Sequence, residues 1–182
     1  MTFERTDFAG LFLVKPRVFQ DERGFFMESF SHDQFVKAGI NAAFIQDNHS
    51  SSRKGVLRGL HFQNPPHAQT KLVRVISGEV IDIVVDLRRD EPTFGKAYTL
   101  TLSAENKIQL LVPKGFAHGF AVISDVAEIV YKCDDYYHPE LEGGINILDE
   151  AFGLKGLLPK ANLIRSEKDI RLPDLAQATF GF

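Results

Sequence analysis

Several titratable side chains of this sequence fall inside apolar, strand-like segments rather than in loops. His61 lies in residues 58–63 (RGLHFQ), and His118 stands between apolar neighbours and glycines. An imidazole, with an ordinary pKa of about 6.5, can act as a general base at neutral pH, and a cation such as Lys71 can stabilise developing negative charge. A lone histidine in this context is more often a hydrogen-bonded core residue. Two histidines on separate strands, close to a lysine, favour a site for acid–base chemistry.

The strand that carries Arg58 and His61 must be irregular if both side chains serve one site. Side chains alternate between the two faces of a strand over residues 56–62, so these two would point to opposite sides. A bulge at Gly59 would re-aim one of them, and bulges are frequent beside active sites. A solvated strand with ordinary surface charges explains the same pattern. Periodicity therefore predicts a polar-lined barrel but no particular reaction.

Short strand candidates, separated mostly by Gly, Pro, Asn or Asp, follow one another along the chain. They cover residues 11–18, 25–30, 43–48, 56–62, 71–76, 80–87, 96–102, 107–112, 117–123, 128–133 and 144–148. In the segment 80–87, alternate residues fall on two different faces. We expect 71–76 and 80–87 to pair as a hairpin through Ser77 and Gly78. So many short strands predict a closed or sandwiched antiparallel architecture, because an open sheet would leave long unpaired edges.

Only two helices are expected. Residues 31–34 (SHDQ) have the pattern of a capping box and Gly39 supplies a stop, while Ser166 begins a second helix-like segment. Taken alone, Asp169 fits the end of that second capping box and Tyr131 fits a core aromatic residue. The pattern as a whole predicts an all-β, jelly-roll-like fold with a few short peripheral helices.

Composition narrows the classes of function. The 182 residues, which we expect to form a single domain over 1–182, carry 21 Lys plus Arg against 24 Asp plus Glu, a net charge of -3. This balance argues against nucleic acid as a partner. A single cysteine requires no oxidising compartment, and no apolar run approaches the roughly 18 residues of a membrane span. The acidic start lacks the features of a secretory signal, so we expect a cytoplasmic protein with no membrane partner.

Several longer motifs carry more information than the strand pattern. They are residues 21–26 (DERGFF), 46–50 (QDNHS), 56–63 (VLRGLHFQ), 92–95 (PTFG), 102–106 (LSAEN), 113–120 (PKGFAHGF), 136–137 (YY) and 166–169 (SEKD). Together they strongly resemble the dTDP-4-dehydrorhamnose 3,5-epimerase family, nearly from end to end. The resemblance implies a cupin-type jelly-roll barrel that acts on a nucleotide-linked 4-keto-6-deoxyhexose, with no cofactor and no metal.

The resemblance also implies roles for individual residues. His61 matches the general base, Asp169 the carboxylate that orients it, Tyr131 the acid on the opposite face of the sugar, and Lys71 the cation near the C4 oxygen. Tyr137 resembles the ring that stacks on thymine. The remaining family positions for binding the nucleotide sugar are Arg23, Glu28, Gln46, Asp47, Asn48, Arg58, His118, Glu142 and Lys168. Members of the family are usually homodimers whose N-terminal strands cross to the other subunit, so Phe19, Arg23 and Glu28 would complete the neighbouring pocket.

Three alternatives stay open. Inversion at C3 or C5 alone would use the same base and acid. A metal-dependent cupin would use His61 and His118 as ligands, although the usual His-x-His pair is absent because Phe62 and Gln63 follow His61. A non-catalytic module that binds sugar nucleotides would not need an acid on the second face. The chain departs from most relatives in having no tryptophan, with apolar residues at the corresponding places.

Overall fold

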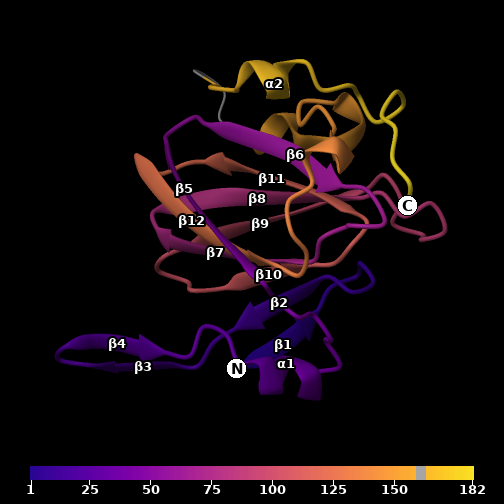
Figure 1. The fold of residues 1–182 in the computed structure, drawn as a ribbon. Helices are drawn as coiled ribbons and strands as arrows, with labels where there is room; N and C mark the ends of the chain where they lie inside the picture. Colours follow the sequence, from indigo (N-terminus) through magenta and orange to yellow (C-terminus); the bar gives the residue numbers. More distant parts are fainter. Residues whose placement is uncertain (159–162) are drawn as a thin grey trace.

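Two antiparallel β-sheets face each other in the computed structural model, which describes residues 1–158 and 163–182 (Figure 1). The six-stranded sheet has the order β1 (Thr2–Arg5), β2 (Phe12–Lys15), β10 (Gln109–Val112), β7 (Lys71–Ser77), β12 (Val126–Cys133) and β5 (Gln46–Arg53). The five-stranded sheet has the order β13 (Glu142–Gly144), β6 (Leu57–Gln63), β11 (Phe116–Val122), β8 (Glu79–Asp86) and β9 (Ala97–Ser103). The sheets confirm the predicted all-β jelly roll with short peripheral helices.

The core between the sheets is built from alternate residues of their central strands. In β8, Val80 and Val84 belong to this core, while Ile83 and Val85 belong to a second cluster that also includes Ile145. The predicted alternation is therefore correct, and residues on both faces of β8 are buried. Complete burial of each such apolar side chain contributes about 1.5–3 kcal/mol to the free energy of unfolding.

The predicted hairpin between residues 71–76 and 80–87 is wrong. β7 pairs with β10 and β12 in one sheet, whereas β8 pairs with β11 and β9 in the other. The short connection crosses from one sheet to the other at Gly78, which has φ +73 and lies so close to the Val126 carbonyl that a Cβ would collide with it. Each strand is apolar on the face that meets the core, but this local pattern does not specify its partner strand.

Short helices decorate the two ends of the barrel. Helix α1 (His32–Lys37) packs Phe35 into an aromatic cluster outside the six-stranded sheet, and Gly39 follows with φ +81. The predicted capping box does not form, because Ser31 makes no side-chain cap bond and Gln34 donates its side-chain hydrogen bond to Glu28. The second predicted helix is confirmed.

That second helix, α2 (Glu167–Ile170), lies above β6 and is capped by Ser166, whose hydroxyl accepts a hydrogen bond from the Asp169 amide at 3.1 Å (Figure 1). Three 3-10 helices accompany the two α-helices: η1 (Pro139–Leu141), η2 (Glu150–Phe152) and η3 (Leu154–Gly156). No helix in the described ranges is long and apolar enough to cross a membrane.

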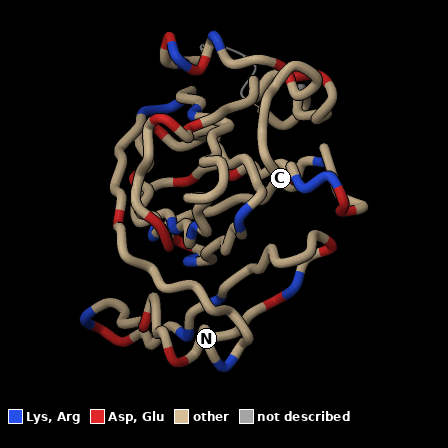
Figure 2. The backbone as a smooth tube through the Cα atoms, turned by 45° about the vertical axis from the view of Figure 1, so that its right-hand side comes forward, with Lys and Arg blue, Asp and Glu red and all other residues tan. Residues whose placement is uncertain are grey.

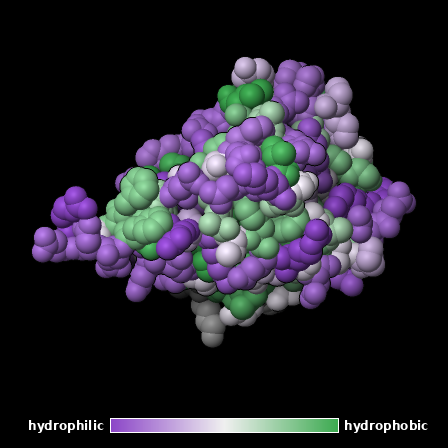
Figure 3. Space-filling model, turned by 90° about the horizontal axis from the view of Figure 1, so that it is seen from below, coloured by the Kyte–Doolittle hydropathy of each residue, from purple (hydrophilic) through white to green (hydrophobic). Residues whose placement is uncertain are grey.

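A two-stranded arm, β3 (Val18–Asp21) and β4 (Gly24–Met27), projects away from the barrel (Figure 1). Its aromatic side chains are exposed, with 70% of the Phe26 surface accessible. Figure 3 shows a projecting hydrophilic tip with hydrophobic side chains gathered between the tip and the body of the molecule. Such exposed aromatic surface on a projecting element is typical of an interaction site.

Candidate active site

A bulge in β6 brings Arg58 and His61 to one face. His61 pairs with His118 and Arg58 pairs with Phe120, so three residue steps on β6 oppose two on β11. Gly59 supplies the extra residue with φ +98, and a Cβ there would lie 2.6 Å from the His118 carbonyl oxygen. The predicted bulge is confirmed, and its cause is a backbone approach that only glycine allows.

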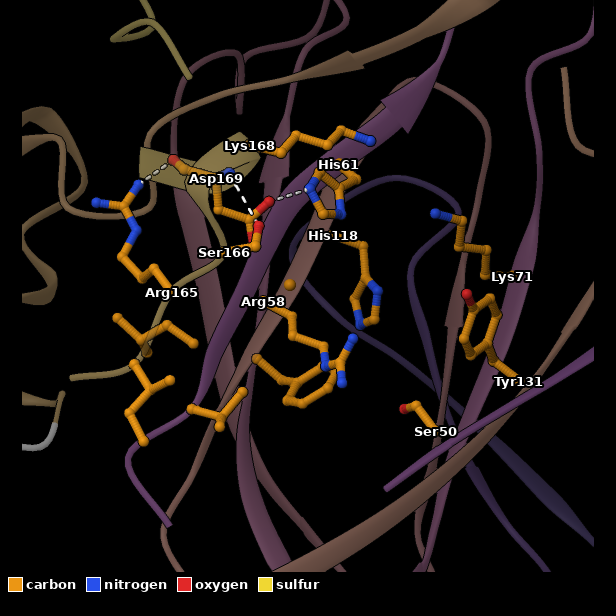
Figure 4. Close-up of a pocket in the computed structure, with 15 residues that line it drawn as sticks. Ser50, Arg58, His61, Lys71, His118, Tyr131, Arg165, Ser166, Lys168 and Asp169 are labelled. Atoms are coloured by element: carbon orange, nitrogen blue, oxygen red, sulfur yellow. Dashed lines mark hydrogen bonds and ion pairs between the residues drawn. The ribbon is translucent and has the colours of Figure 1, made fainter. Parts of the chain in front are cut away.

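A cavity of about 510 Å³ opens between the two sheets beside this bulge. His61 and Asp169 lie on one wall, and Tyr131 and Lys71 lie on the opposite wall (Figure 4). The cavity is lined by Ser50, Val56, Leu57, Arg58, His61, Lys71, His118, Gly119, Phe120, Tyr131, Ile164, Arg165, Ser166, Lys168 and Asp169. The structure therefore brings together the four predicted catalytic residues with Arg58, His118 and Lys168.

His61 and Asp169 form a hydrogen-bonded pair, with 2.8 Å between His61 Nε2 and Asp169 Oδ1. The Asp169 side chain is almost fully buried, at 5% exposure. Burial opposes ionisation of this carboxyl, but the hydrogen bond and the charge of His61 outweigh burial and hold the Asp169 pKa below its ordinary value. The pair thus keeps a charged carboxylate directly behind the imidazole ring.

His118 has a buried carboxylate partner of its own. Its Nε2 lies 2.9 Å from Asp82 Oδ2, and the Asp82 side chain is fully buried. Asp82 was not among the predicted site residues, although a charged residue in the middle of an apolar strand is a signal for such a pair. His61 and His118 therefore each face a different carboxylate.

Lys71 and Tyr131 come from neighbouring strands of the six-stranded sheet. Tyr131 on β12 pairs with Val73, and Cys133 pairs with Lys71, so both side chains point to the inner face. Burial lowers the pKa of Lys71, although the negative charges of Glu142 and Asp82 oppose this shift. Burial also raises the pKa of Tyr131. The wall opposite His61 thus offers a phenol that keeps its proton at neutral pH.

A second cavity of about 280 Å³ shares His61, Lys71 and Tyr131 with the first. It is also lined by Gln46, Asn48, Phe62, Gln63, Gln69, Tyr137 and Glu142. Glu142 accepts hydrogen bonds from the Tyr137 hydroxyl and from Lys168, both at 2.6 Å. Burial opposes ionisation of Glu142, but these two partners outweigh it and lower its pKa. The shared residues make the two cavities adjacent parts of one cleft.

Three predicted binding residues lie elsewhere in this chain. Arg23 is in the turn of the projecting arm and pairs with Asp21, and Glu28, which follows β4, accepts from Gln34. Asp47 lies on the outer side of β5, because side chains alternate along the strand, and it pairs with Lys132 at 2.9 Å. None of the three lines the two cavities.

Some residues of the cleft were not predicted. Ser50 lines the larger cavity from β5, and Arg165 lies below Asp169, donating to the Asp169 carbonyl and to Asn146 (Figure 4). Ser50 shares the inner face of β5 with Asn48, a period-2 signal that was available. Arg165 lies outside any regular element, so no periodicity marks it. Figure 2 shows that charged residues occur along barrel strands as well as loops.

Comparison with known proteins identifies the family to which the chain belongs. The sequence model of the dTDP-4-dehydrorhamnose 3,5-epimerase family matches residues 5–177. The chain belongs to this family. The match confirms the predicted resemblance, and with it the cupin-type jelly roll and the enzyme class, an epimerase among the isomerases.

The similarity to individual epimerases extends over nearly the whole chain. The dTDP-4-dehydrorhamnose 3,5-epimerase of Shigella flexneri is 51% identical over 171 residues, which is 93% of both chains. A crystal structure of the 3,5-epimerase of Legionella pneumophila, in complex with dTDP-4-keto-L-rhamnose, is 45% identical and superposes with a TM-score of 0.92 over 97% of this chain and 93% of that one. A 3'-monoepimerase from Streptomyces bikiniensis, in complex with dTDP-quinovose, is 31% identical, with a TM-score of 0.88 over 95% and 87%.

Proposed function

We propose that this protein inverts C3 and C5 of dTDP-4-dehydro-6-deoxy-D-glucose and so forms dTDP-4-dehydro-L-rhamnose. Both carbons neighbour the C4 ketone, so removal of either proton gives an enolate whose charge rests on the C4 oxygen. The observation that carries the proposal is the placement of His61 and Tyr131 on opposite walls of one cavity. Inversion needs a base on one face of the sugar ring and an acid on the other.

His61 is the general base in this proposal. Its ring faces the cavity, and Asp169 behind it favours the charged imidazolium that forms when His61 takes a proton. Asp169 also fixes the orientation of the ring, because it bonds the Nε2 atom and is itself buried. The other ring nitrogen is then left for the sugar.

Tyr131 is the proposed acid that returns a proton to the other face. Burial keeps its hydroxyl protonated at neutral pH, as a donor must be. Lys71 on the same wall is the proposed cation for the C4 oxygen, where charge develops. Arg58 and His118 complete the polar lining as contacts to the substrate.

The nucleotide end of the substrate is proposed to occupy the second cavity. Gln46, Asn48 and Glu142 offer hydrogen-bonding groups there, and the half-exposed ring of Tyr137 provides a surface for the thymine. Lys168, which reaches Glu142 across the cleft, provides a positive charge for the pyrophosphate. This local charge suits a dianionic linker in a protein whose net charge is negative.

We propose that Arg23 and Glu28 act in the pocket of a second copy of the chain. Both belong to the projecting arm region and lie outside the two cavities of their own chain. A homodimer in which each arm reaches its partner would bring them to a substrate, with Phe19 beside them. We expect this dimer to work in the cytoplasm, where nucleotide sugars are made.

The experiment that tests the function is incubation of the protein in heavy water with dTDP-4-dehydro-6-deoxy-D-glucose, followed by proton NMR. Solvent deuterium at both C3 and C5, and L-rhamnose formation when the 4-ketoreductase is added, support double inversion. Deuterium at one carbon alone supports the second candidate, a single-site epimerase, which the similarity to the 3'-monoepimerase of Streptomyces bikiniensis favours.

A metal-dependent reaction in the larger cavity has weaker support than metal-free epimerisation. Among residues 1–158 and 163–182, the one group of three or more potential ligands with all ligand atoms within 4.8 Å of one another is His67, Asp135 and His138, outside both cavities. Chelator-sensitive turnover with stoichiometric metal would reverse this assignment. If the protein only binds sugar nucleotides, neither the wild type nor His61→Ala catalyses a reaction. If it is an epimerase, His61→Ala loses turnover and keeps its affinity for the nucleotide.

A further inference from the structure

Two histidines and an aspartate meet next to Gln63 and Gln69, two residues that line the second cavity. His67 lies in the connection between β6 and β7, and Asp135 and His138 lie in the connection between β12 and η1. The potential ligand atoms of the three side chains all lie within 4.8 Å of one another, and each residue is partly buried. The reaction proposed for the cleft uses none of the three.

The contacts inside this cluster already approach those of a metal site. His67 Nδ1 lies 3.1 Å from Asp135 Oδ2, and a tetrahedral ion with bonds of about 2.1 Å would hold two ligand atoms roughly 3.4 Å apart. The two imidazole rings are stacked, with 3.9 Å between their centroids and 15° between their planes. The three side chains are thus already gathered in one place, with all potential ligand atoms within 4.8 Å of one another.

The backbone around the cluster is fixed by two glutamine side chains. The Gln63 amide donates to the carbonyl oxygens of His67 and Tyr136 and accepts from the His138 amide at 2.7 Å. Gln69 donates to the carbonyl oxygen of Asp135 at 2.9 Å. The two connections are therefore held together independently of the ring contacts, which is the preorganisation that a ligand site needs.

We propose that His67, Asp135 and His138 form a binding site for a divalent transition-metal ion of the zinc class. Imidazole nitrogen and carboxylate oxygen are ligands that such ions accept, and a three-ligand set leaves one position for water. Glu140, whose Oε1 lies 3.0 Å from His138 Nδ1, orients the second ring as carboxylates do for metal-bound histidines. The site ties residues 64–70 to residues 134–138, and it is independent of the function proposed for the cleft.

The test is a calorimetric titration of the untagged full chain with Zn²⁺ alone, repeated with Co²⁺ to record the absorption spectrum of the bound ion. We expect one saturable site per chain and an increase in Tm on metal addition. His67→Asn and His138→Asn should each weaken binding by about 10- to 100-fold or more and remove the Tm increase, because loss of a supporting contact alone costs that much.

The matched control is His49→Asn, which removes an exposed histidine that faces a single carboxylate, Glu128, at 3.1 Å. This variant should bind Zn²⁺ as the wild type does. Because His67 and His138 lie on different connections, either variant carries the test if the other fails to fold. The proposal would be overturned by the absence of saturable Zn²⁺ binding, or by an unchanged affinity for Zn²⁺ in both His67→Asn and His138→Asn. Loss of Zn²⁺ binding in His61→Asn would also overturn it, because the ion would then be bound in the cleft.

Discussion

The charge of Lys71 is the feature of the cavity that a single substitution removes most cleanly. Lys71→Met keeps the length and apolar character of the side chain and deletes the ammonium group proposed to face the C4 oxygen. We expect kcat to fall by about 10²–10³-fold, as when an oxyanion donor is lost, with KM little changed. Steady-state kinetics, with the exposed Lys54→Met as a control, measure this effect. Equal kcat in both variants would contradict the role of Lys71.

The Asp169 carboxylate gives the stability of the protein a pH dependence of definite sign. Its pKa is lower in the folded chain than its ordinary value of 3.8, so ionisation favours the folded state. This contribution is complete above pH 3.8 and is lost as the pH falls through the lower, folded-state pKa. Thermal unfolding at a series of acidic pH values should therefore show a steeper loss for wild type than for Asp169→Asn. Parallel curves would show that the His61 contact contributes no pH-dependent stability.

Residues of the site differ in how well their sequence context reveals them. His61, Tyr131 and Asp169 were assigned from the resemblance to the family, because each taken alone fits an ordinary core or capping residue. Alternation by itself placed His61 and Arg58 on opposite faces, and only the bulge reconciles them. Asp82 was not predicted because its role depends on a hydrogen bond with His118, which is 36 positions away in the sequence and is brought near only by the fold.

At the scale of elements, the bulge in β6 is the feature on which the geometry of the cavity depends. Gly59→Ala would force a Cβ to within 2.6 Å of the His118 carbonyl oxygen at φ +98. We expect the backbone to shift, stability to fall by at least about 1–3 kcal/mol, and activity to fall together with it. Chemical denaturation and kinetics of the variant measure both effects.

Gly39→Ala is the matched control for that substitution. Gly39 also has a positive φ, +81, but nothing lies within 4 Å of the position of a Cβ. It should lose stability through backbone conformation alone and keep its activity. If Gly59→Ala were as active as Gly39→Ala, the bulge would not be needed to aim Arg58 and His61.

The strands themselves were largely predictable, and their partners were not. Seven of the eleven expected segments, 56–62, 71–76, 80–87, 96–102, 107–112, 117–123 and 128–133, correspond closely to observed strands, because alternation and turn residues are local signals. The expected strand over 144–148 is wrong, since β13 covers Glu142–Gly144 and shares only Gly144 with it. Strands β1 and β3 were missed because both are mostly exposed and each pairs with a single strand, β1 with β2 and β3 with β4. The connection at Gly78 joins strands of two different sheets. Which sheet each strand enters depends on pairing with distant segments, and a short stretch of sequence does not contain that information.

At the scale of the whole molecule, the projecting arm leads to a prediction about assembly. Its exposed phenylalanines and its position outside the barrel support a dimer in which Arg23 serves the neighbouring pocket. Sedimentation at micromolar concentration should give a dimer. His61→Ala and Arg23→Ala homodimers should each be impaired, whereas subunits exchanged between them should recover about a quarter of wild-type activity, because half of the dimers then hold one intact pocket. A monomer, or mixing without recovery, would contradict the shared pocket.

The proposed mechanism depends most on His61 and Tyr131 acting on opposite faces of one sugar, and isotope exchange in Tyr131→Phe measures this most directly. In heavy water with dTDP-4-dehydro-6-deoxy-D-glucose, we expect this variant to exchange deuterium into the substrate at C3 or C5 while inversion falls by about 10²–10⁴-fold. His61→Ala should show neither exchange nor inversion. Inversion at the wild-type rate in either variant, or exchange that persists without His61, would contradict the two-wall mechanism.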